Sequence, residues 1–440
     1  MKLILFNLIL SFPFFIYAQK PVSINSTSSI DTIKNFRSTI KKNSSVAKEQ
    51  QNKKALFVIV DGIPADVVEK VNTPNFDAIA KVGGFTRAHV GGEKGGYSET
   101  PTISAVGYNS LLTGTWVNKH NVWDNDIAAP NYNYWTIFRL FKEQYPGRKA
   151  AVFSSWEDNR TKLVGENLTA IGNLKLDYHF DGLELDTVNY PHDKKRDFMH
   201  RIDEAVVDNA ENYIKTEAPD LSWVYLEYTD DMGHMYGDSP EFYKAVEMMD
   251  NQMGKLWKAI LYRENKFSED WVIYITTDHG RTANNGKGHG GQSDRERNTW
   301  IVTNAKGLNE YFKTGNPGIV DIIPSIAKHL KITIPRERLM EVDGIPLTGN
   351  ISATSANATI HDGKIHVSWK AVSKKGNAKI WLATTNHFKE GGTDEYKLVV
   401  TVPLAKQEAI IDVKNNPSTF YKIVIEAPNN MINYWIVEKK

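Results

Sequence analysis

Three apolar runs, each followed by potential metal ligands, constrain the fold of this chain more than any other feature. The runs cover 55–60, 223–228 and 271–277 and are rich in β-branched and aromatic residues. Such runs are typical of strands buried on both faces of a sheet. The side chains that follow them are Asp61, then Asp230 and His234, then Asp278 and His279. Because open α/β sheets bind ligands at the carboxyl ends of their strands, these side chains are predicted to share one sheet edge.

The order of the predicted elements indicates the fold class. From 55 to about 349, strand-like runs such as 150–154 alternate with helical patterns such as 197–215. This alternation predicts an α/β region with a mostly parallel, doubly wound sheet. From 351 to 440 the pattern changes to about seven short alternating runs separated by turn residues. These predict a C-terminal β-sandwich resembling immunoglobulin-like or fibronectin type III domains, which we interpret as a packing appendage.

The first residues have the pattern of an export signal. A basic start, a short apolar core and Ala18 predict a signal peptide over 1–18, although Ile16 leaves the cleavage site undefined. The apolar run is short for a membrane span. Residues 19–54 are polar and are predicted to form a flexible tether. With no cysteine, the chain forms no disulfides and has no lipid-attachment cysteine. We expect a bacterial periplasmic or secreted protein.

Composition excludes some kinds of partner. The chain has 440 residues, 41% hydrophobic and 24% charged, which is ordinary for a globular protein. Its formal net charge of +1 gives no electrostatic footprint for nucleic acid. The expected partner is a small-molecule or head-group ligand, and the oligomeric state is not defined by the sequence.

Ser104 is the candidate nucleophile. A short helix is predicted over 105–112, with Gly114 ending it and Ser104 as its N-cap. Most serines in this position only cap a helix. A helix N-terminus also stabilises an attacking alkoxide and a phosphoryl oxygen. Thr102 lies close by and remains a second candidate.

The predicted ligand set favours two divalent cations. Carboxylate oxygen and imidazole nitrogen suit zinc, although manganese and magnesium accept similar oxygen-rich sets. Each residue alone has a structural explanation: Asp61 could cap a loop, and His289 could be a surface loop residue. The metal interpretation depends on all six ligands occurring together, namely Asp61, Asp230, His234, Asp278, His279 and His289.

The ordered motifs resemble the alkaline phosphatase superfamily, and most closely its type I nucleotide pyrophosphatase/phosphodiesterase branch. The matching segments are Val60-Asp61-Gly62, 73–77, the Thr113-Gly114 pair nine residues after Ser104, the 119–125 segment, and the three motifs that contain the remaining ligands. The resemblance implies that Asp230, His234 and His289 hold one metal. It implies that Asp61, Asp278 and His279 hold the other, which Ser104 approaches or bridges. Asn125 would donate to a phosphoryl oxygen, and hydrolysis would pass through a phosphoserine.

Departures from that branch affect the substrate. Ala105–Tyr108 replaces the usual Phe-Pro-Asn-His, and only ten residues separate His279 from His289, which leaves no room for the usual capping insertion. Monoesterases of the superfamily need further cations, for which Arg160 and Lys162 are candidates, but two acidic residues beside them oppose a dianion. We therefore expect a phosphodiesterase, with a phosphomonoesterase as the alternative.

Other functions fit the sequence less well. A sulfatase needs a Cys or Ser followed by x-Pro-Ser-Arg, which is missing after Ser104. The predicted export disfavours phosphoglycerate mutase chemistry. A surface binding protein with a vestigial metal site is the alternative from a different class, and retention of all six ligands disfavours it.

Overall fold

The computed structural model describes residues 52–437. The predicted signal peptide and all but the last three residues of the predicted tether lie outside this range. The described residues belong to one compact unit, so the predicted boundary near residue 350 stays a prediction. Within 52–437, no helix is long and apolar enough to cross a membrane.

A seven-stranded sheet forms the centre of the α/β region, in the order β2-β7-β6-β1-β5-β3-β4. Strand β7 runs antiparallel to both of its neighbours, and the other pairings are parallel. Continuous apolar runs explain this layout, because parallel strands are buried on both faces. The strands are β1 (Lys53–Val60), β2 (Gly84–His89), β3 (Ala150–Ser154), β4 (Tyr178–Phe180), β5 (Leu221–Leu226), β6 (Asp270–Thr276) and β7 (Asn298–Thr303).

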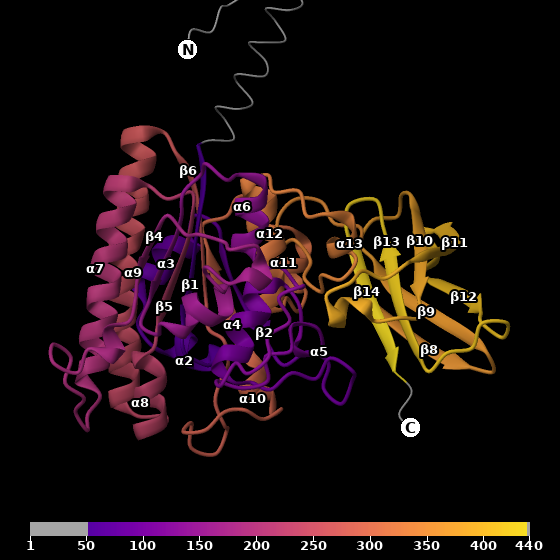
Figure 1. Ribbon diagram of the computed structural model, residues 1–440. Coiled ribbons are helices and arrows are strands. Elements are labelled where there is room, and N and C mark those ends of the chain that lie inside the picture. Colours follow the sequence, from indigo (N-terminus) through magenta and orange to yellow (C-terminus); the bar gives the residue numbers. More distant parts are fainter. Residues whose placement is uncertain (1–51, 438–440) are drawn as a thin grey trace, which may run out of the picture. The chain divides into compact units, whose positions relative to one another are not determined.

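Helices cover both faces of this sheet, as Figure 1 shows for α7 and α9 on one side and α6 and α12 on the other. Successive residues of β1 point to opposite faces, so Phe57 joins one buried cluster and Val58 the other. One cluster contains side chains of α4 (Ser104–Thr113), α6 (Ile137–Gln144) and α12 (Ile322–Leu330). The other contains side chains of α2 (Ala65–Lys70), α3 (Pro74–Ala80), α7 (Asp197–Glu217) and α9 (Pro240–Phe267). The doubly wound architecture predicted from the sequence is confirmed.

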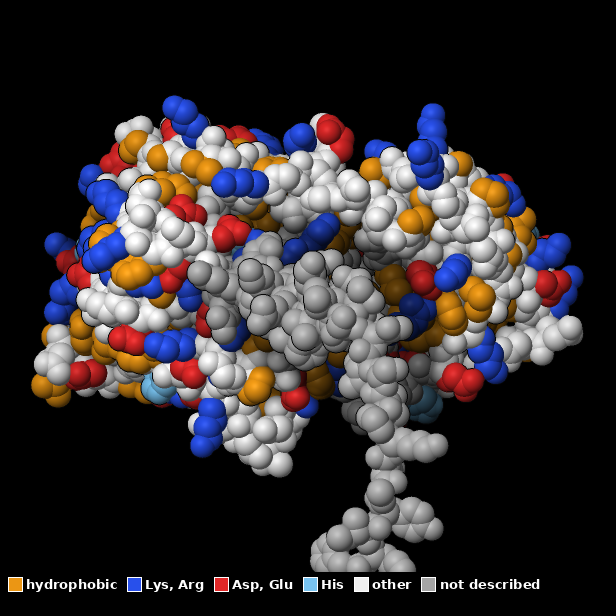
Figure 2. All heavy atoms as spheres, turned by 90° about the horizontal axis from the view of Figure 1, so that it is seen from above, with side chains coloured by type: hydrophobic (Ala, Val, Ile, Leu, Met, Phe, Trp, Pro, Cys, Tyr) orange, Lys and Arg blue, Asp and Glu red, His pale blue; other side chains and the backbone are white. Residues whose placement is uncertain are grey.

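Shorter helical elements connect these layers. They are α5 (Val117–His120), α8 (Tyr228–Tyr236), α10 (Asp294–Arg297), α11 (Glu310–Thr314), α13 (Arg336–Leu339), the π-helix η1 (Asn159–Val164), and the 3₁₀ turns η2 (Thr169–Ile171), η3 (Leu183–Leu185), η4 (Ile319–Asp321), η5 (His387–Glu390) and η6 (Leu404–Lys406). Figure 2 shows acidic and basic side chains interspersed on the face that it presents, in keeping with the balanced charge of the chain.

The C-terminal region consists of two antiparallel sheets, ordered β11-β10-β13-β14 and β12-β9-β8. In β9 buried and exposed residues alternate, which is the pattern of a sheet with one face in a core. A separate antiparallel region after the α/β region confirms the predicted fold class. Its strands are β8 (Ala353–His361), β9 (Lys364–Ala371), β10 (Asn377–Ala383), β11 (Lys397–Pro403), β12 (Glu408–Asp412), β13 (Phe420–Glu426) and β14 (Met431–Val437).

Candidate active site

Strand register brings the predicted ligands together. Val60 pairs with Leu226, and Ile59 pairs with Thr276, so β1, β5 and β6 end at the same level. The six ligands form two groups of three, and within each group the ligand atoms lie within 4.8 Å of one another. One group is Asp61, Asp278 and His279, and the other is Asp230, His234 and His289.

The first group lies directly beyond the ends of β1 and β6 and is buried. Asp61 Oδ1 and Asp278 Oδ2 accept no hydrogen bond from the described residues. Each of these oxygens lies 3.3 Å from His279 Nε2. The opposite ring nitrogen, His279 Nδ1, lies 2.9 Å from the Gly280 carbonyl oxygen, which is the usual way of aiming Nε2 at a metal.

The pKa values of this group reflect an excess of negative charge around one imidazole. Burial and the neighbouring Asp61 carboxylate raise the pKa of Asp278 well above its usual value. Burial alone would lower the pKa of His279, but Asp278 and Asp61 outweigh it and raise the pKa to about 9. Two carboxylates confined around one imidazole are the arrangement that a divalent cation would neutralise.

The second group comes from α8 and the loop after β6. We expected Asp230 and His234 on a loop, but α8 places them one turn apart on the same helix face, with His234 Nε2 3.1 Å from Asp230 Oδ2. His289 Nε2 lies 3.1 Å from His234 Nε2, while His289 Nδ1 lies 2.9 Å from the Thr102 carbonyl oxygen. Asp230 also lies 4.0 Å from His279 Nε2, so the two groups adjoin.

Arg281 was not predicted from the sequence and is fully buried beside Asp230. Its guanidinium donates to the Asp230 carboxylate and to the Gly62 carbonyl oxygen. Burial alone would raise the pKa of Asp230, but Arg281 and His234 hold the pKa well below its usual range. Gly62 (φ 70°) and Gly233 make this position possible, because a Cβ on either would overlap Arg281. The one sequence feature that could have indicated this role is the place of Arg281, a basic residue two positions after the Asp278-His279 pair.

Two tyrosines, also unpredicted, hold the other oxygen of Asp61. Tyr108 on α4 and Tyr225 on β5 both donate to Asp61 Oδ2, the second at 2.8 Å. Both rings are buried in the apolar cluster. They fix the carboxylate so that Oδ1, the oxygen without a hydrogen-bond donor, points away from both hydroxyls.

Ser104 lies at the start of α4, but it is not the N-cap that we predicted. Ile103 occupies the N-cap position, and Ser104 is the first residue of α4. Its hydroxyl therefore does not cap the helix and instead lies 3.5 Å from His279 Nε2. Gly114 ends the helix in the left-handed conformation (φ 67°), as predicted. Thr102 donates to the Gly291 carbonyl oxygen and accepts from Gly290 N, so it anchors the loop of His289.

Asn125 reaches the same helix end. Its Oδ1 accepts a hydrogen bond of 3.0 Å from the backbone N–H of Ala105. This contact uses the oxygen of the amide and leaves Nδ2 as a donor beside Ser104.

A cavity of about 360 Å³ opens over this edge. Arg160 and Lys162, predicted as substrate ligands, are not among the described residues that line it. Arg160 instead contacts Asp181, Glu166 and Glu157, and Lys162 pairs with Asp158. Their predicted role therefore remains untested. The lining residues are Asp61, Ser104, Tyr108, Asn125, Trp156, Glu184, His192, Arg196, Phe198, Met199, Tyr225, Glu227 and Asp230.

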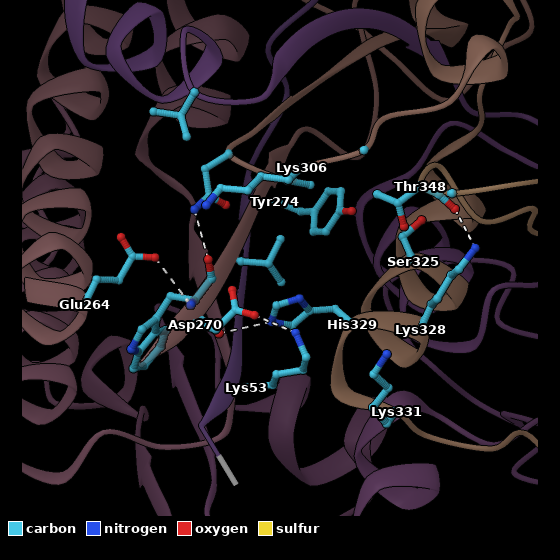
Figure 3. Close-up of a pocket in the computed structure, with 17 residues that line it drawn as sticks. Lys53, Glu264, Asp270, Tyr274, Lys306, Ser325, Lys328, His329, Lys331 and Thr348 are labelled. Atoms are coloured by element: carbon cyan, nitrogen blue, oxygen red, sulfur yellow. Dashed lines mark hydrogen bonds and ion pairs between the residues drawn. The ribbon is translucent and has the colours of Figure 1, made fainter. Parts of the chain in front are cut away.

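A second cavity of about 360 Å³ lies at the opposite, amino ends of β1 and β6. Figure 3 shows the lysines around it and the ion pair between Lys53 and Asp270, whose charged atoms are 2.5 Å apart. His329 Nε2 lies 3.1 Å from the Asp270 carbonyl oxygen. Neither of the two candidate ligand groups in the described part of the chain lies here.

A mostly parallel sheet with two candidate ligand groups at one edge, together with the family match, places this protein in the alkaline phosphatase superfamily. The model of the type I phosphodiesterase / nucleotide pyrophosphatase family matches residues 55–331. The chain therefore belongs to that family.

Curated relatives match more distantly. Human ectonucleotide pyrophosphatase/phosphodiesterase family member 7 is 25% identical over 248 residues, covering 54% of this chain and 50% of the relative. Human family member 5 is 26% identical over 249 residues, covering 54% and 46%. The chain spans about half the length of these relatives. The solved structure of human family member 5 is similar at 16% identity, with a TM-score of 0.46, covering 64% of this chain and 96% of that chain.

Proposed function

We propose that this chain is an exported phosphodiesterase that uses two divalent cations, zinc in the first instance, and forms a phosphoserine on Ser104. One observation carries the proposal. The Ser104 hydroxyl lies 3.5 Å from His279, at a cavity shared with Asp61 and Asp230, where buried carboxylate oxygens lack partners. Export of the protein is inferred from the predicted signal peptide over 1–18.

The donor set fits divalent cations. Each group combines carboxylate oxygen with imidazole nitrogen, and His279 and His289 each turn their Nδ1 to a backbone carbonyl. Asp61, Asp278 and His279 would hold one ion, and Asp230, His234 and His289 the other. When bound, the two ions would polarise the phosphoryl oxygens and lower the pKa of the serine hydroxyl.

The chain supplies the remaining chemistry. The Ser104 hydroxyl gives its proton to solvent water and Oγ forms a bond to phosphorus. The P–O bond to the alcohol breaks on the opposite side, and the leaving oxygen takes a proton from water. Free backbone N–H groups at the start of α4 and the Asn125 amide stabilise the charge that develops on the phosphoryl oxygens. Water then attacks the phosphoserine, which releases a phosphomonoester and restores the serine.

The cavity walls favour a diester over a monoester. Arg196 is the only Lys or Arg among the described residues that line the cavity, and it is already paired with Glu227 and Asp231 at 3.0 and 2.6 Å. Glu184 adds a further carboxylate to the wall. A phosphodiester carries one negative charge, whereas the second charge of a monoester would meet no free cation here.

The test compares kcat/KM of the zinc-loaded protein on bis(4-nitrophenyl) phosphate and on 4-nitrophenyl phosphate. We expect the diester to be preferred. Ser104→Ala should lower kcat/KM by about 10³-fold or more while zinc content is kept. Ser110→Ala, a buried serine on the same helix, is the matched control and should stay near the wild type. Mass spectrometry after an acid quench should find phosphate on Ser104. A monoester preference, or full activity in Ser104→Ala, would overturn the proposal.

A further inference from the structure

The loop that carries Asn125 is anchored within itself at Val122 and Ile127, which are buried in the apolar cluster, and by the hydrogen bond of 2.8 Å from Asn121 Nδ2 to the Ala129 carbonyl oxygen. This loop runs over 121–133, between α5 and the segment that enters α6, and we call it the Asn125 loop. Trp123, Asp124, Asn125 and Asp126 are exposed. A hydrogen bond of 2.8 Å from Asn131 N to the His120 carbonyl oxygen closes its base. Because the four residues between these anchors are exposed, the contacts that hold the two ends of the loop also contribute to the position of Asn125.

The first end is held through Lys119, whose side chain is fully buried. Its ammonium donates at 2.8 Å to Asn433 Oδ1 on β14, and also to Asp343 and to the Glu341 carbonyl oxygen. Asn433 in turn donates to the Val342 carbonyl oxygen at 2.7 Å. Strand β14 thus binds Lys119, two residues before the loop, and the segment that leads into the C-terminal region.

The second end is held by side-chain amides. Asn131 Nδ2 donates to the Phe388 carbonyl oxygen at 3.2 Å, and Asn133 Nδ2 donates to the carbonyl oxygens of Phe388 and Gly392 at 3.2 and 2.8 Å. The acceptors belong to η5 and the residues just after it. The rings of Tyr134 and Phe388 also pack together, with centroids 5.1 Å apart.

A buried charge network lies beneath both attachments. Glu341 accepts from Lys422 at 2.9 Å and from Tyr396 at 2.7 Å, and Lys422 also donates to Asp394 at 2.8 Å. The Lys422 and Glu341 side chains are essentially unexposed. Buried charges that are fully paired resist displacement, because losing one partner leaves the other charge uncompensated. The attachments of the Asn125 loop therefore rest on a stiff base.

We infer that the C-terminal β-sandwich positions the Asn125 amide for catalysis, because β14 and η5 together hold both ends of the Asn125 loop. This inference rests on the proposed function. Asn131, Asn133 and Asn433 are positioning residues that act through Asn125. It extends our interpretation of the C-terminal region as a packing appendage.

The test removes one attachment. The double variant Asn131→Ala/Asn133→Ala should lower kcat on the diester about 10-fold, a part of the loss expected for one transition-state donor, with KM and zinc content unchanged. Asn433→Ala removes the other attachment and should act in the same direction. Glu426→Gln is the control, because it weakens a 2.8 Å ion pair with Arg336 between the same two regions, away from the loop.

A combination with Asn125→Ala separates positioning from general damage. If the attachments act through Asn125, adding Asn131→Ala/Asn133→Ala to Asn125→Ala should cause almost no further loss of kcat. Additive losses would overturn the inference, because they would show a general structural effect.

Hydrogen exchange gives a readout that needs no activity. Amides of 121–130 should exchange faster in Asn131→Ala/Asn133→Ala than in the wild type or in Glu426→Gln. Unchanged exchange would overturn the inference. A wild-type protein that hydrolyses no phosphate ester would overturn the proposed function, and the exchange measurement would still decide whether β14 and η5 hold the loop.

Discussion

Two parts of this molecule bury charged side chains, but only one of them pairs every buried charge with a partner. At the carboxyl edge of the sheet, Asp61 and Asp278 each leave an oxygen with no hydrogen bond from the described residues. At the junction with the C-terminal region, Lys119 and Lys422 are matched by Glu341, Asp343 and Asp394. None of these five side chains appears among the unpartnered buried atoms of the described chain.

The difference separates a binding site from a structural junction. A buried charge without partners is costly, so it persists only where something outside the chain compensates it. In a paired network each charge already has an internal partner, so the network needs no external ion and its removal would mainly cost stability. By burial and charge alone, the two clusters look alike. They differ in whether each buried polar atom has a hydrogen-bond partner within the described chain.

Metal removal should have the largest effect. Stripping the protein with a chelator should lower its Tm, since a ligand at 1,000 times its Kd contributes about 4 kcal/mol per site. Calorimetry before and after adding back zinc measures the change, with calcium as the comparison ion. If zinc leaves the Tm unchanged, the carboxyl-edge cluster is not an ion-binding site, and the proposed difference between the two clusters is wrong.

Breaking the paired network should come next. Lys422→Met leaves Glu341 and Asp394 uncompensated, and we expect a loss of about 3–5 kcal/mol in the free energy of unfolding. Denaturant titration measures it. Lys397→Met, an exposed lysine in the same region, is the control and should change stability little. If both variants lose the same amount, the network has no special role.

Asp278→Asn should raise the free energy of unfolding of the metal-free protein, whereas Lys422→Met should lower it. The substitution removes one of two carboxylates that raise each other's energy, and the amide can donate to the neighbouring Asp61. We expect a gain on the order of 1 kcal/mol without metal, from the pKa scale. Zinc bound per chain should fall at the same time. Destabilisation of the metal-free variant would contradict the idea that this cluster awaits a cation.

The smallest expected effect is a pH dependence at the junction. Burial alone would raise the pKa of Asp394, but hydrogen bonds from Lys422 and Thr385 outweigh it and keep the pKa below its usual value. The stability that this carboxylate contributes is therefore present above pH of about 4 and is lost as the pH falls. The stability difference between the wild type and Asp394→Asn should shrink from pH 6 to pH 3. A difference that is constant over this range would argue against the pairing.

The sequence predicted the parts of the site that follow directly from strands. Asp61, Asp278 and His279 come immediately after apolar runs, so their position at the sheet edge could be inferred from strand geometry. Asp230 and His234 were placed near the correct edge but on a loop, since nothing in the run before them marked the start of α8. The position of Ser104 was displaced by one residue, because caps differ from first helical residues only in backbone angles.

Long-range contacts could not be predicted in the same way. Tyr108 and Tyr225 lie in stretches that are typical of a core, and only the folded structure shows their hydroxyls on Asp61. Arg160 and Lys162 were chosen for charge, which does not reveal that carboxylates of their own neighbourhood already bind them. Asn131 and Asn133 contact backbone atoms more than 250 positions away, for which the sequence has no signal.

The contact between Arg281 and Asp230 makes the two candidate metal positions unequal. Asp230 already shares its charge with an internal guanidinium, whereas the two carboxylates of Asp61 and Asp278 have only His279 beside them, a candidate ligand that must give up its proton to bind a metal. A divalent cation gains more where negative charge is uncompensated. Occupancy should therefore be ordered, with the Asp61 position filling first and the Asp230 position only at higher free metal. When metal is scarce, the prevailing form of this protein would carry a single ion.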